Sequence, residues 1–509
     1  MKHTCMMMAL LICFVMILTA CSRTPTEQPA ETTVPTGGAE TTTAVSAEDS
    51  PYDSNGFLKD DLPEDLDLGG TEINVFVGDY NGAYIDDLYV EEESGDRLSD
   101  AVYKTRRAVE DRLNVQLTYN WETYPYSKLS SFLTTVTANI MSGDQAFDLL
   151  LDMNNFGYKQ LEGEYFLNLQ DTKYIDLEKP WYNQSILEIM PTDDIFFVSG
   201  AFSLANVKNT YATYFNADLY ESLGKTEDLY DLVDSGNWTL EKMEMLISDV
   251  YQDVNGNSEV DPSDRFGLSF GDINKYLGFL PAFNVKIYTR TNDGYDFTYG
   301  NEHAVDVADR VIALVNENIN VIKGQKNSAD FLEWQIASTG GNYISRVFTE
   351  GRALFSNGLV ADAGVIVGEI DFEYGLLPYP KWDASQEEYQ TSLQRSCYAL
   401  IPTSTFKADE ASAVLEALSS ESYRSLVPEY CEVMLKTRYA QDNDVSRMFE
   451  LIRNSIVYDL GLIYTRGTPE GYIRSAIVSQ LNWSSHIESK RQSLITEMDK
   501  VFAGANAAE

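Results

Sequence analysis

Strand and helix patterns alternate through the first part of the globular sequence, and this order restricts the fold more than any other feature. Residues 73–77 are a short apolar run typical of a buried strand, and residues 98–113 place apolar side chains on one face at helical spacing. A second strand pattern covers residues 115–119, and a predicted helix over 127–141 leads to a third strand pattern over 147–153. This order predicts an α/β layer with a mostly parallel sheet.

The alternation is less even in the rest of the chain. Residues 210–224 form a β-branched and aromatic run that leads into a short helix, and Thr239 is a suitable N-cap for the next one. "RFGLSF" is a strand pattern, residues 303–318 form an amphipathic helix pattern, and the sequence from Lys407 onward is mainly helical. The globular part holds roughly 450 residues, which is enough chain for two to three domains.

The N-terminus has the pattern of a secretory signal over residues 1–20, with a basic start followed by a long apolar run. Its last residues, Leu-Thr-Ala-Cys, resemble the lipobox of bacterial lipoproteins, which implies that Cys21 is acylated and anchors the chain to a membrane. Residues 21–55 are rich in Thr, Pro, Ala and Glu and predict a disordered tether. No later segment is apolar enough to predict a membrane span.

Charge and cysteine content exclude some function classes. The formal net charge is −42, and a chain so acidic lacks the clustered Lys and Arg that nucleic acid binding needs. Only Cys397 and Cys431 follow Cys21, so the sequence has no disulfide framework, and whether these two cysteines pair stays open. The two histidines beyond the signal, His303 and His486, are too isolated to predict a zinc site or a serine–histidine mechanism.

The ordered set of motifs resembles a known family. After the lipobox come a strand ending in Gly-Asp, the strand "FDLLLDMNNFGY", the segment "YATYFNADL", "GNWTLEKM", "FTEGRALFSNG" and "YGLLPYPK". Together these are similar to the extracellular solute-binding proteins of the sugar-binding class of ABC importers, which share the plan of maltose-binding protein. The resemblance covers nearly the whole chain after the signal.

This resemblance implies a two-lobed periplasmic-binding-protein-like α/β fold, in which each lobe is a mostly parallel sheet flanked by helices and crossing hinge strands join the lobes. Lobe one is expected at residues 56–210 and 345–390, and lobe two at 211–344 and 391–509. The implied function is to capture a carbohydrate, most simply an oligosaccharide, in the cleft and deliver it to ABC transporter permease subunits. The chain would lie on the outer face of the cell membrane, held by its lipid, and would not be an enzyme.

Sugars stack their apolar faces on aromatic rings and pair their hydroxyls with carboxylates and amides, and such sites lie beyond the carboxyl ends of strands. These rules and the family pattern nominate the ligand-binding candidates Asp79, Tyr80, Tyr84, Asp152, Asn154, Asn155, Asn209, Tyr211, Asp272, Tyr276 and Asn357. Leu359 and Val360 stand where the family often places an aromatic after Asn357, which weakens the case for stacking there. The alternative is that the aspartates staple turns and the tyrosines only pack.

The segment "DVNGNSEVDPSD" has the spacing of a calcium loop. Oxygen donors stand at the places that such a loop uses, namely Asp253, Asn255, Asn257, Glu259 through its carbonyl, Asp261 and Asp264. Ser258 replaces the usual glycine at the sixth place, and Asp264 is shorter than the usual glutamate. The sequence favours a structural calcium ion over a metal-free turn held by Asx hydrogen bonds.

Two other classes remain open. A lipid-anchored glycoside hydrolase needs only a pair of carboxylates at a suitable separation, and 79 acidic residues make such pairs easy to propose. The chain lacks the even eightfold alternation of a barrel. A calcium-dependent surface scaffold or adhesion protein is the second alternative, although docking modules of that kind carry two calcium loops in tandem and this sequence has one.

Overall fold

The computed structural model describes residues 50–153, 164–191, 193–292, 294–324, 335–337, 343–435, 443–464 and 469–508. The chain divides into two compact units, Met1–Pro51 and Tyr52–Glu509, and the fold described below is that of the second unit. Cys21, the predicted signal, nearly all of the predicted tether, Asn154 and Asn155 lie outside the described residues.

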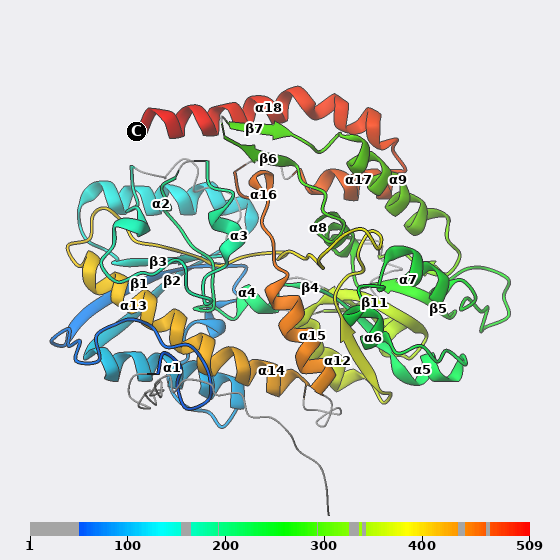
Figure 1. Cartoon of the computed structure of the whole chain (residues 1–509), viewed down its shortest axis with the longest axis horizontal. Helices are drawn as coiled ribbons and strands as arrows, with labels where there is room; N and C mark the ends of the chain where they lie inside the picture. Colours follow the sequence, from blue (N-terminus) through cyan, green and yellow to red (C-terminus); the bar gives the residue numbers. More distant parts are fainter. Residues whose placement is uncertain are drawn as a thin grey trace, which may run out of the picture. The chain divides into compact units, whose positions relative to one another are not determined.

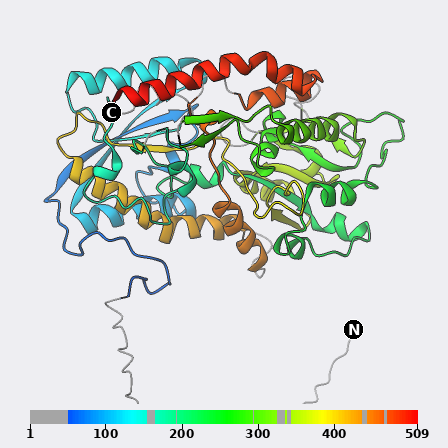
Figure 2. The same ribbon diagram turned by 45° about the horizontal axis from the view of Figure 1, so that its top comes forward.

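The first sheet combines early strands with one strand from far along the chain. Its order is β13-β3-β1-β2, with bounds β1 Thr71–Tyr80, β2 Val115–Tyr124, β3 Leu149–Asp152 and β13 Tyr398–Leu400. β1 pairs in parallel with β2 and β3, whereas β13 runs antiparallel to β3. Figures 1 and 2 show α2 over one face of this sheet, and α1 and α13 over the other. The helices of this region are α1 Arg97–Leu113, α2 Leu129–Ser142, α3 Gln184–Leu187, α4 Ala205–Lys208, α13 Ala408–Glu421 and α14 Val427–Leu435.

Local chemistry explains the predicted part of this region. Asp96 caps α1 by accepting a hydrogen bond from the Ser99 amide at 2.9 Å, and Asn114 ends the helix in a left-handed conformation. Gly78 lies in β1 where a Cβ would come within 2.1 Å of a carboxylate oxygen of Asp152, so the parallel pairing of β1 with β3 requires a glycine there. The strands and helices predicted between residues 73 and 153 are confirmed, with ends shifted by a few residues.

The second sheet has the order β12-β4-β11-β5-β8, with bounds β4 Tyr211–Asn216, β5 Phe266–Phe270, β8 Val321–Ile322, β11 Ala353–Leu359 and β12 Tyr374–Leu377. β11, β5 and β8 are parallel, and β4 runs antiparallel to both β11 and β12. Each sheet therefore contains one reversed strand, β13 in the first and β4 in the second. The predicted class, two mostly parallel sheets flanked by helices, is confirmed.

The remaining helices and hairpins lie around the second sheet and beside the region where the two sheets adjoin (Figure 1). The helices are α5 Ala217–Ser222, α6 Leu229–Asp234, α7 Leu240–Ile247, α8 Phe279–Ala282, α9 Glu302–Glu317, α11 Arg346–Thr349, α12 Ala363–Glu369, α15 Asn443–Asn454, α16 Leu460–Tyr464, α17 Gly471–Ser479 and α18 Trp483–Ala508. Two short hairpins, β6 Tyr288–Thr291 with β7 Gly294–Phe297 and β9 Gln335–Ala337 with β10 Tyr343–Ser345, complete the strands.

The expected division of the chain between the lobes is wrong for the segment 345–390. β11 and β12 of that segment pair with β4 in the second sheet, not with the first sheet. Conversely, β13 from the segment 391–509 pairs with β3, and α13 packs on α1. The sequence could not show this exchange because each strand is a short apolar run that fits either sheet.

Three segments meet where the chain passes between the sheets, and we call them the hinge: residues 209–211, 391–394 and 455–457. The Tyr211 amide donates to the Ser392 carbonyl at 3.2 Å, and the Gln394 amide donates to the Asn209 carbonyl at 2.9 Å. Thr391 joins the third segment, because its amide donates to the Ser455 carbonyl at 2.9 Å. The hinge is thus a small hydrogen-bonded sheet of its own between two larger ones.

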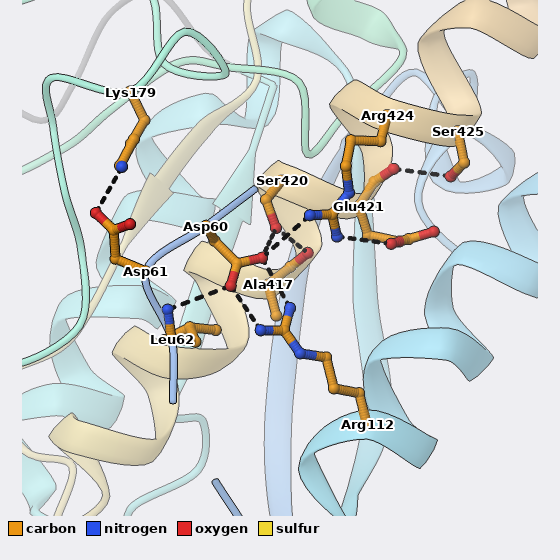
Figure 3. A network of polar contacts seen from close by, with 10 residues as sticks. All are labelled: Asp60, Asp61, Leu62, Arg112, Lys179, Ala417, Ser420, Glu421, Arg424 and Ser425. Atoms are coloured by element: carbon orange, nitrogen blue, oxygen red, sulfur yellow. Dashed lines mark hydrogen bonds and ion pairs between the residues drawn. The ribbon is translucent and has the colours of Figure 1, made fainter. Parts of the chain in front are cut away.

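A buried carboxylate ties the start of the unit to the helices behind the first sheet (Figure 3). Asp60 accepts two hydrogen bonds from the Arg112 guanidinium at 2.6 and 2.7 Å and one from the Ser420 hydroxyl at 2.6 Å. Arg424 adds a further contact at 3.5 Å. Burial by itself raises the pKa of Asp60, but the hydrogen bonds from Arg112 and Ser420 and the charges of both arginines outweigh it, so the pKa lies below its usual value.

We expect Asp60→Ala to lower the free energy of unfolding by about 3 kcal/mol, because it leaves two arginines beside an empty, buried position. Asp61→Ala is the matched control, since the neighbouring Asp61 is exposed and pairs only with Lys179, and it should cost less than about 1 kcal/mol. Urea denaturation at pH 7 measures both. Because the folded pKa of Asp60 is lowered, its contribution is present above the unfolded pKa and is lost as the pH falls through the folded value. Equal losses in both variants would contradict this role.

Candidate functional site

Side chains from both lobes gather beside the hinge, and we call Tyr80, Tyr84, Asn209, Tyr211, Lys275, Arg395, Glu470 and Arg474 the interlobe cluster. Tyr80 and Tyr84 follow the end of β1, and Arg395 stands between the hinge and β13. Lys275 comes from the turn after β5, and Glu470 and Arg474 come from the start of α17. The cluster therefore brings together the carboxyl ends of strands from both sheets, where ligand sites of open α/β sheets lie.

Arg395 connects the first-lobe tyrosines. Its guanidinium carbon lies 4.0 Å from the centroid of the Tyr80 ring, a cation–π contact. Tyr84 is 1% exposed, and its hydroxyl makes no hydrogen bond. Burial raises the pKa of Tyr84 to about 12, opposed in part by the positive charge of nearby Arg395 and by the adjacent Asn209 side chain. The hydroxyl is therefore a neutral donor at any physiological pH.

The second lobe supplies a buried chain of polar side chains to the same place. Lys275 is fully buried, and its ammonium donates to the Gln394 side chain at 3.3 Å while the Asp272 carboxylate lies 4.0 Å away. Arg474 donates to the Asn274 side chain at 2.7 Å. The Tyr211 ring lies near Arg395, Arg474 and Glu470, whose charges act on its hydroxyl. Both lobes thus present cationic and hydroxyl groups to the hinge.

Several predicted ligand residues are used within the protein. Asp79 accepts hydrogen bonds from the Tyr84 amide at 3.0 Å and the Thr123 hydroxyl at 3.1 Å, so it staples the turn that positions Tyr84. Asp152 is buried and accepts from the Tyr124 hydroxyl at 2.6 Å. For these two aspartates the turn or packing alternative describes the contacts seen.

The predicted ligand residues of the second lobe also make contacts within the protein. Asp272 is buried and accepts from the amides of Asn274 at 2.7 Å and Tyr343 at 3.1 Å, which fixes the turn after β5. The Tyr276 hydroxyl donates to the Gly324 carbonyl at 2.9 Å, so this ring packs. Asn357 accepts from the Thr213 hydroxyl at 3.0 Å, while its side-chain nitrogen makes no hydrogen bond. None of these contacts tests whether the residues also touch a ligand.

The charged members of the cluster, Lys275, Arg395, Glu470 and Arg474, are not among the predicted ligand residues. The family resemblance implies a crossing between the lobes near residues 380–402, so the position of Arg395 was one available signal. Glu470 and Arg474 lie in an ordinary helical stretch, and only the fold brings them to the hinge. Burial raises the pKa of Glu470 to about 7, although Arg474 and Arg395 act in the opposite direction.

Two cavities adjoin the hinge. One of about 70 Å³ lies beside Tyr211, Gln394 and Glu470, and it is smaller than the roughly 300–1,000 Å³ of small-molecule pockets. The other, of about 510 Å³, lies among residues 180–207 and 453–458 on the hinge. The described residues therefore leave only a small space at the interlobe cluster in this conformation.

The loop 253–264 is closed by its own polar groups. The pairing of Gln252 with Arg265 clips its ends together, and Asp264 is fully buried and accepts from the Val254 amide at 3.1 Å. Asp253 accepts from the Gly256 and Ser258 amides at 2.6 and 2.9 Å. Ser258 has a φ of 63°, the left-handed conformation that a glycine at the sixth place of a calcium loop supplies.

Three side chains among the predicted calcium ligands also contact one another. The Asp261 carboxylate accepts from the side-chain amides of Asn255 at 3.1 Å and Asn257 at 2.6 Å, so three of the predicted ligands converge. Asp and Asn oxygens are the donors that calcium prefers. Within the described residues, no group of three or more His, Cys, Asp or Glu side chains is arranged to hold a metal ion.

The two sheets, each with one reversed strand, and the hydrogen-bonded hinge between them define a two-lobed α/β fold of the periplasmic-binding-protein type. No family model matches the chain, and no curated protein matches it in sequence. No helix in the described part of the chain is long and apolar enough to cross a membrane.

Solved structures share this fold at low sequence identity. The galacto-N-biose-/lacto-N-biose I-binding protein of the ABC transporter from Bifidobacterium longum, in complex with lacto-N-biose, is similar with a TM-score of 0.54 and 11% identity, over 86% of this chain and 98% of that chain. The GacH receptor of Streptomyces glaucescens matches with a TM-score of 0.53 and 11% identity, over 84% and 99%. The ABC substrate-binding protein Lmo0181 from Listeria monocytogenes, in complex with cycloalternan, matches with a TM-score of 0.50 and 11% identity, over 86% and 99%. All three are binding proteins or receptors.

The raised pKa of Glu470 has a consequence for stability. Its folded pKa of about 7 exceeds the ordinary value of 4.5, so the group stabilises the fold fully below about pH 4.5 and loses this contribution as the pH rises through 7. We expect Glu470→Gln to reduce the loss of unfolding free energy between pH 5 and 7.5 by about 1–3 kcal/mol. Urea denaturation across this pH range measures it. The exposed Glu241→Gln is the control, and an unchanged pH profile in Glu470→Gln would contradict the assignment.

Proposed function

We propose that this chain is a solute-binding protein that captures a carbohydrate between its two lobes and passes it to the permease of an ABC transporter. The observation that carries the proposal is the interlobe cluster, where Tyr84, Asn209 and Arg395 present buried polar groups without partners beside the hinge. The likeness of the fold to sugar-binding proteins of ABC transporters supports the same reading. Neither observation calls for a reaction, so binding is the activity proposed.

The mechanism follows from where the cluster lies. A ligand that touches Tyr80 and Tyr84 on one lobe and Lys275 and Arg474 on the other is held by both lobes only when they are close together. Its binding energy therefore favours the closed arrangement, and closure is a shift of population that the ligand drives. The hinge segments are joined mainly by backbone hydrogen bonds, and a few residues of this kind can absorb the backbone rotation of such a motion.

Membrane anchoring is a separate proposal. An acyl chain on Cys21 would place the unit beside a permease on the outer face of the membrane, at the end of the tether 21–55. The support for it is the lipobox-like sequence. The glycoside hydrolase and the scaffold alternatives gain no supporting observation from the described residues.

Tyr84→Phe tests the ligand site without weakening the fold. Because the buried Tyr84 hydroxyl lacks a partner, its removal should leave the free energy of unfolding unchanged or raise it slightly. If a sugar hydroxyl pairs with it, affinity should fall about tenfold. Thermal shift against an oligosaccharide panel identifies a ligand, and calorimetry then measures its dissociation constant and any turnover.

Tyr288→Phe is the matched control, because Tyr288 also has a buried hydroxyl without a hydrogen-bond partner among the described residues but packs in the β6–β7 hairpin, against Tyr295 and Phe297. It should bind the same sugar as tightly as the unaltered chain does. Equal losses in both variants, or none in either, would count against the interlobe cluster. Sugar cleavage in the calorimeter would favour the hydrolase instead.

We further propose that the loop 253–264 binds a structural calcium ion. The support is the spacing of its oxygen donors, the left-handed Ser258 at the sixth place and the convergence of Asn255, Asn257 and Asp261. In that role Asp253, Asn255, Asn257, the Glu259 carbonyl, Asp261 and Asp264 would hold the ion. The ion would fix the connection from α7 to β5, whose far end carries Asp272 and Lys275.

Calcium at 100 times its dissociation constant would stabilise the fold by about 2.7 kcal/mol. Adding a chelator should therefore lower the melting temperature by a few degrees, and Asp253→Ala should remove this sensitivity. Asp383→Ala is the control, because Asp383 likewise accepts turn amides, from Ser385 and Gln386, outside the loop. Differential scanning calorimetry with and without calcium, and with magnesium as a second cation, measures the effect. A chelator response that persists in Asp253→Ala would place the metal elsewhere.

A further inference from the structure

Three hydrogen-bond donors in the interlobe cluster have no acceptor among the residues that the structure describes. They are the Tyr84 hydroxyl, the side-chain nitrogen of Asn209 and the Nε of Arg395, and all three atoms are buried. Tyr84 and Asn209 are 1% and 2% exposed, so water does not supply the missing acceptor freely. The Asn209 side chain adjoins the Tyr84 hydroxyl, and the charge of Arg395 also acts on that hydroxyl, so the three groups are neighbours.

A buried donor without an acceptor costs free energy, and the cost is largest for a charged group. Arg395 can only donate, and among the described residues its guanidinium contacts the Tyr80 ring and forms no ion pair. This is unusual in a chain whose net charge is −42, because carboxylates are abundant elsewhere on it. The arrangement is complete only when an acceptor, preferably an anionic one, enters.

None of the nearby acids accepts a hydrogen bond from the three donors. Asp79 accepts from the Tyr84 amide and the Thr123 hydroxyl, and Asp87 pairs through one oxygen with Lys208 at 2.6 Å while its other oxygen makes no hydrogen bond within the described residues. Glu470 carries less than its full charge near neutral pH, because burial raises its pKa to about 7. None of these acids neutralises Arg395, so its positive charge is left for a ligand.

The Tyr80 ring prepares Arg395 for this role. The guanidinium carbon lies 4.0 Å from the ring centroid, which holds its plane, while its Nε makes no hydrogen bond within the described residues. A guanidinium can donate to the two oxygens of a carboxylate or sulfate. Lys275 is fully buried, donates to Gln394 at 3.3 Å and lies 4.0 Å from the Asp272 carboxylate, so the other lobe adds a cation whose charge is partly balanced.

We infer that the carbohydrate taken by this site is acidic, with a carboxylate or sulfate group bound by Arg395, Tyr84 and Asn209. This inference rests on the proposed function and narrows its ligand class. The anion would accept hydrogen bonds from all three donors. It would also be attracted by the Lys275 ammonium when the lobes close. Repulsion from the acidic surface does not prevent it, since charges more than about 8 Å away are screened at physiological ionic strength.

The experiment uses the mature chain in 0.15 M salt and matched oligosaccharide mixtures. Hydrolysates of pectin and alginate supply carboxylates, a hydrolysate of carrageenan supplies sulfate, and each is compared with its own carboxyl-reduced or desulfated product. Neutral malto-, xylo- and galacto-oligosaccharides complete the set. Thermal shift finds the binders. Calorimetry then compares Arg395→Gln with the control Arg310→Gln, because the guanidinium of Arg310 on α9 pairs with Glu244 on α7.

We expect at least one acidic mixture to bind, and the loss of its charge to weaken binding about tenfold or more. Arg395→Gln should weaken it to a similar extent, while Arg310→Gln should not change it. The reduced and desulfated products show which acid group is recognised. Binding only to neutral sugars, equal binding to charged and neutralised mixtures, or unchanged binding in Arg395→Gln would overturn the inference and leave the proposed function standing. If no carbohydrate binds, the proposed function fails as well.

Discussion

The antiparallel pairing of residues 209–211 with 391–394 is the contact on which the rest of the structure depends. Both segments pass between the sheets, and each then enters the sheet that it joins against the direction of its neighbours, as β4 and β13. This pairing explains why each otherwise parallel sheet contains one reversed strand. It also explains why strands far apart in sequence, such as β3 and β13, are neighbours. A break in the hinge would therefore disturb both sheets at once, whereas a change at an outer strand would disturb one.

The same crossing places polar groups without hydrogen-bond partners among the described residues beside the hinge. Asn209 and Arg395 lie next to the backbone atoms that pair at the hinge, so their side chains cannot move away without disturbing it. Replacing buried polar groups by apolar ones commonly stabilises a protein, and a chain selected for stability alone would have little reason to keep these donors. Keeping them at the junction of two lobes is the pattern expected of a site whose partner arrives from outside.

Much of the fold could be predicted, because its signals are local. The apolar face of α1, its Asp96 cap and the strand patterns on either side all lie within one stretch of sequence. The exchange of β11, β12 and β13 between the lobes could not be predicted, since sheet membership is decided by pairing between residues 140 to 250 positions apart in the sequence. The site shows the same limit. Tyr80, Tyr84, Asn209, Tyr211 and Lys275 lie at or after predicted strands or crossings, but Glu470 and Arg474 reach the hinge only through packing.

Asp79 and Asp272 show that an aspartate after a strand can hold a turn in a position where a ligand-binding residue is expected. Asp79 and Asp272 stand after β1 and β5, the positions where ligand groups are expected, yet each accepts backbone amides of the turn that follows. By fixing these turns they orient Tyr84 in one lobe and the segment of Lys275 in the other. A position at the end of a strand therefore predicts that a residue shapes the site, but not whether it contacts the ligand. In this chain Tyr84 and Lys275, two hydrogen-bond donors of the interlobe cluster, come shortly after these aspartates, and the aspartates hold those residues in place.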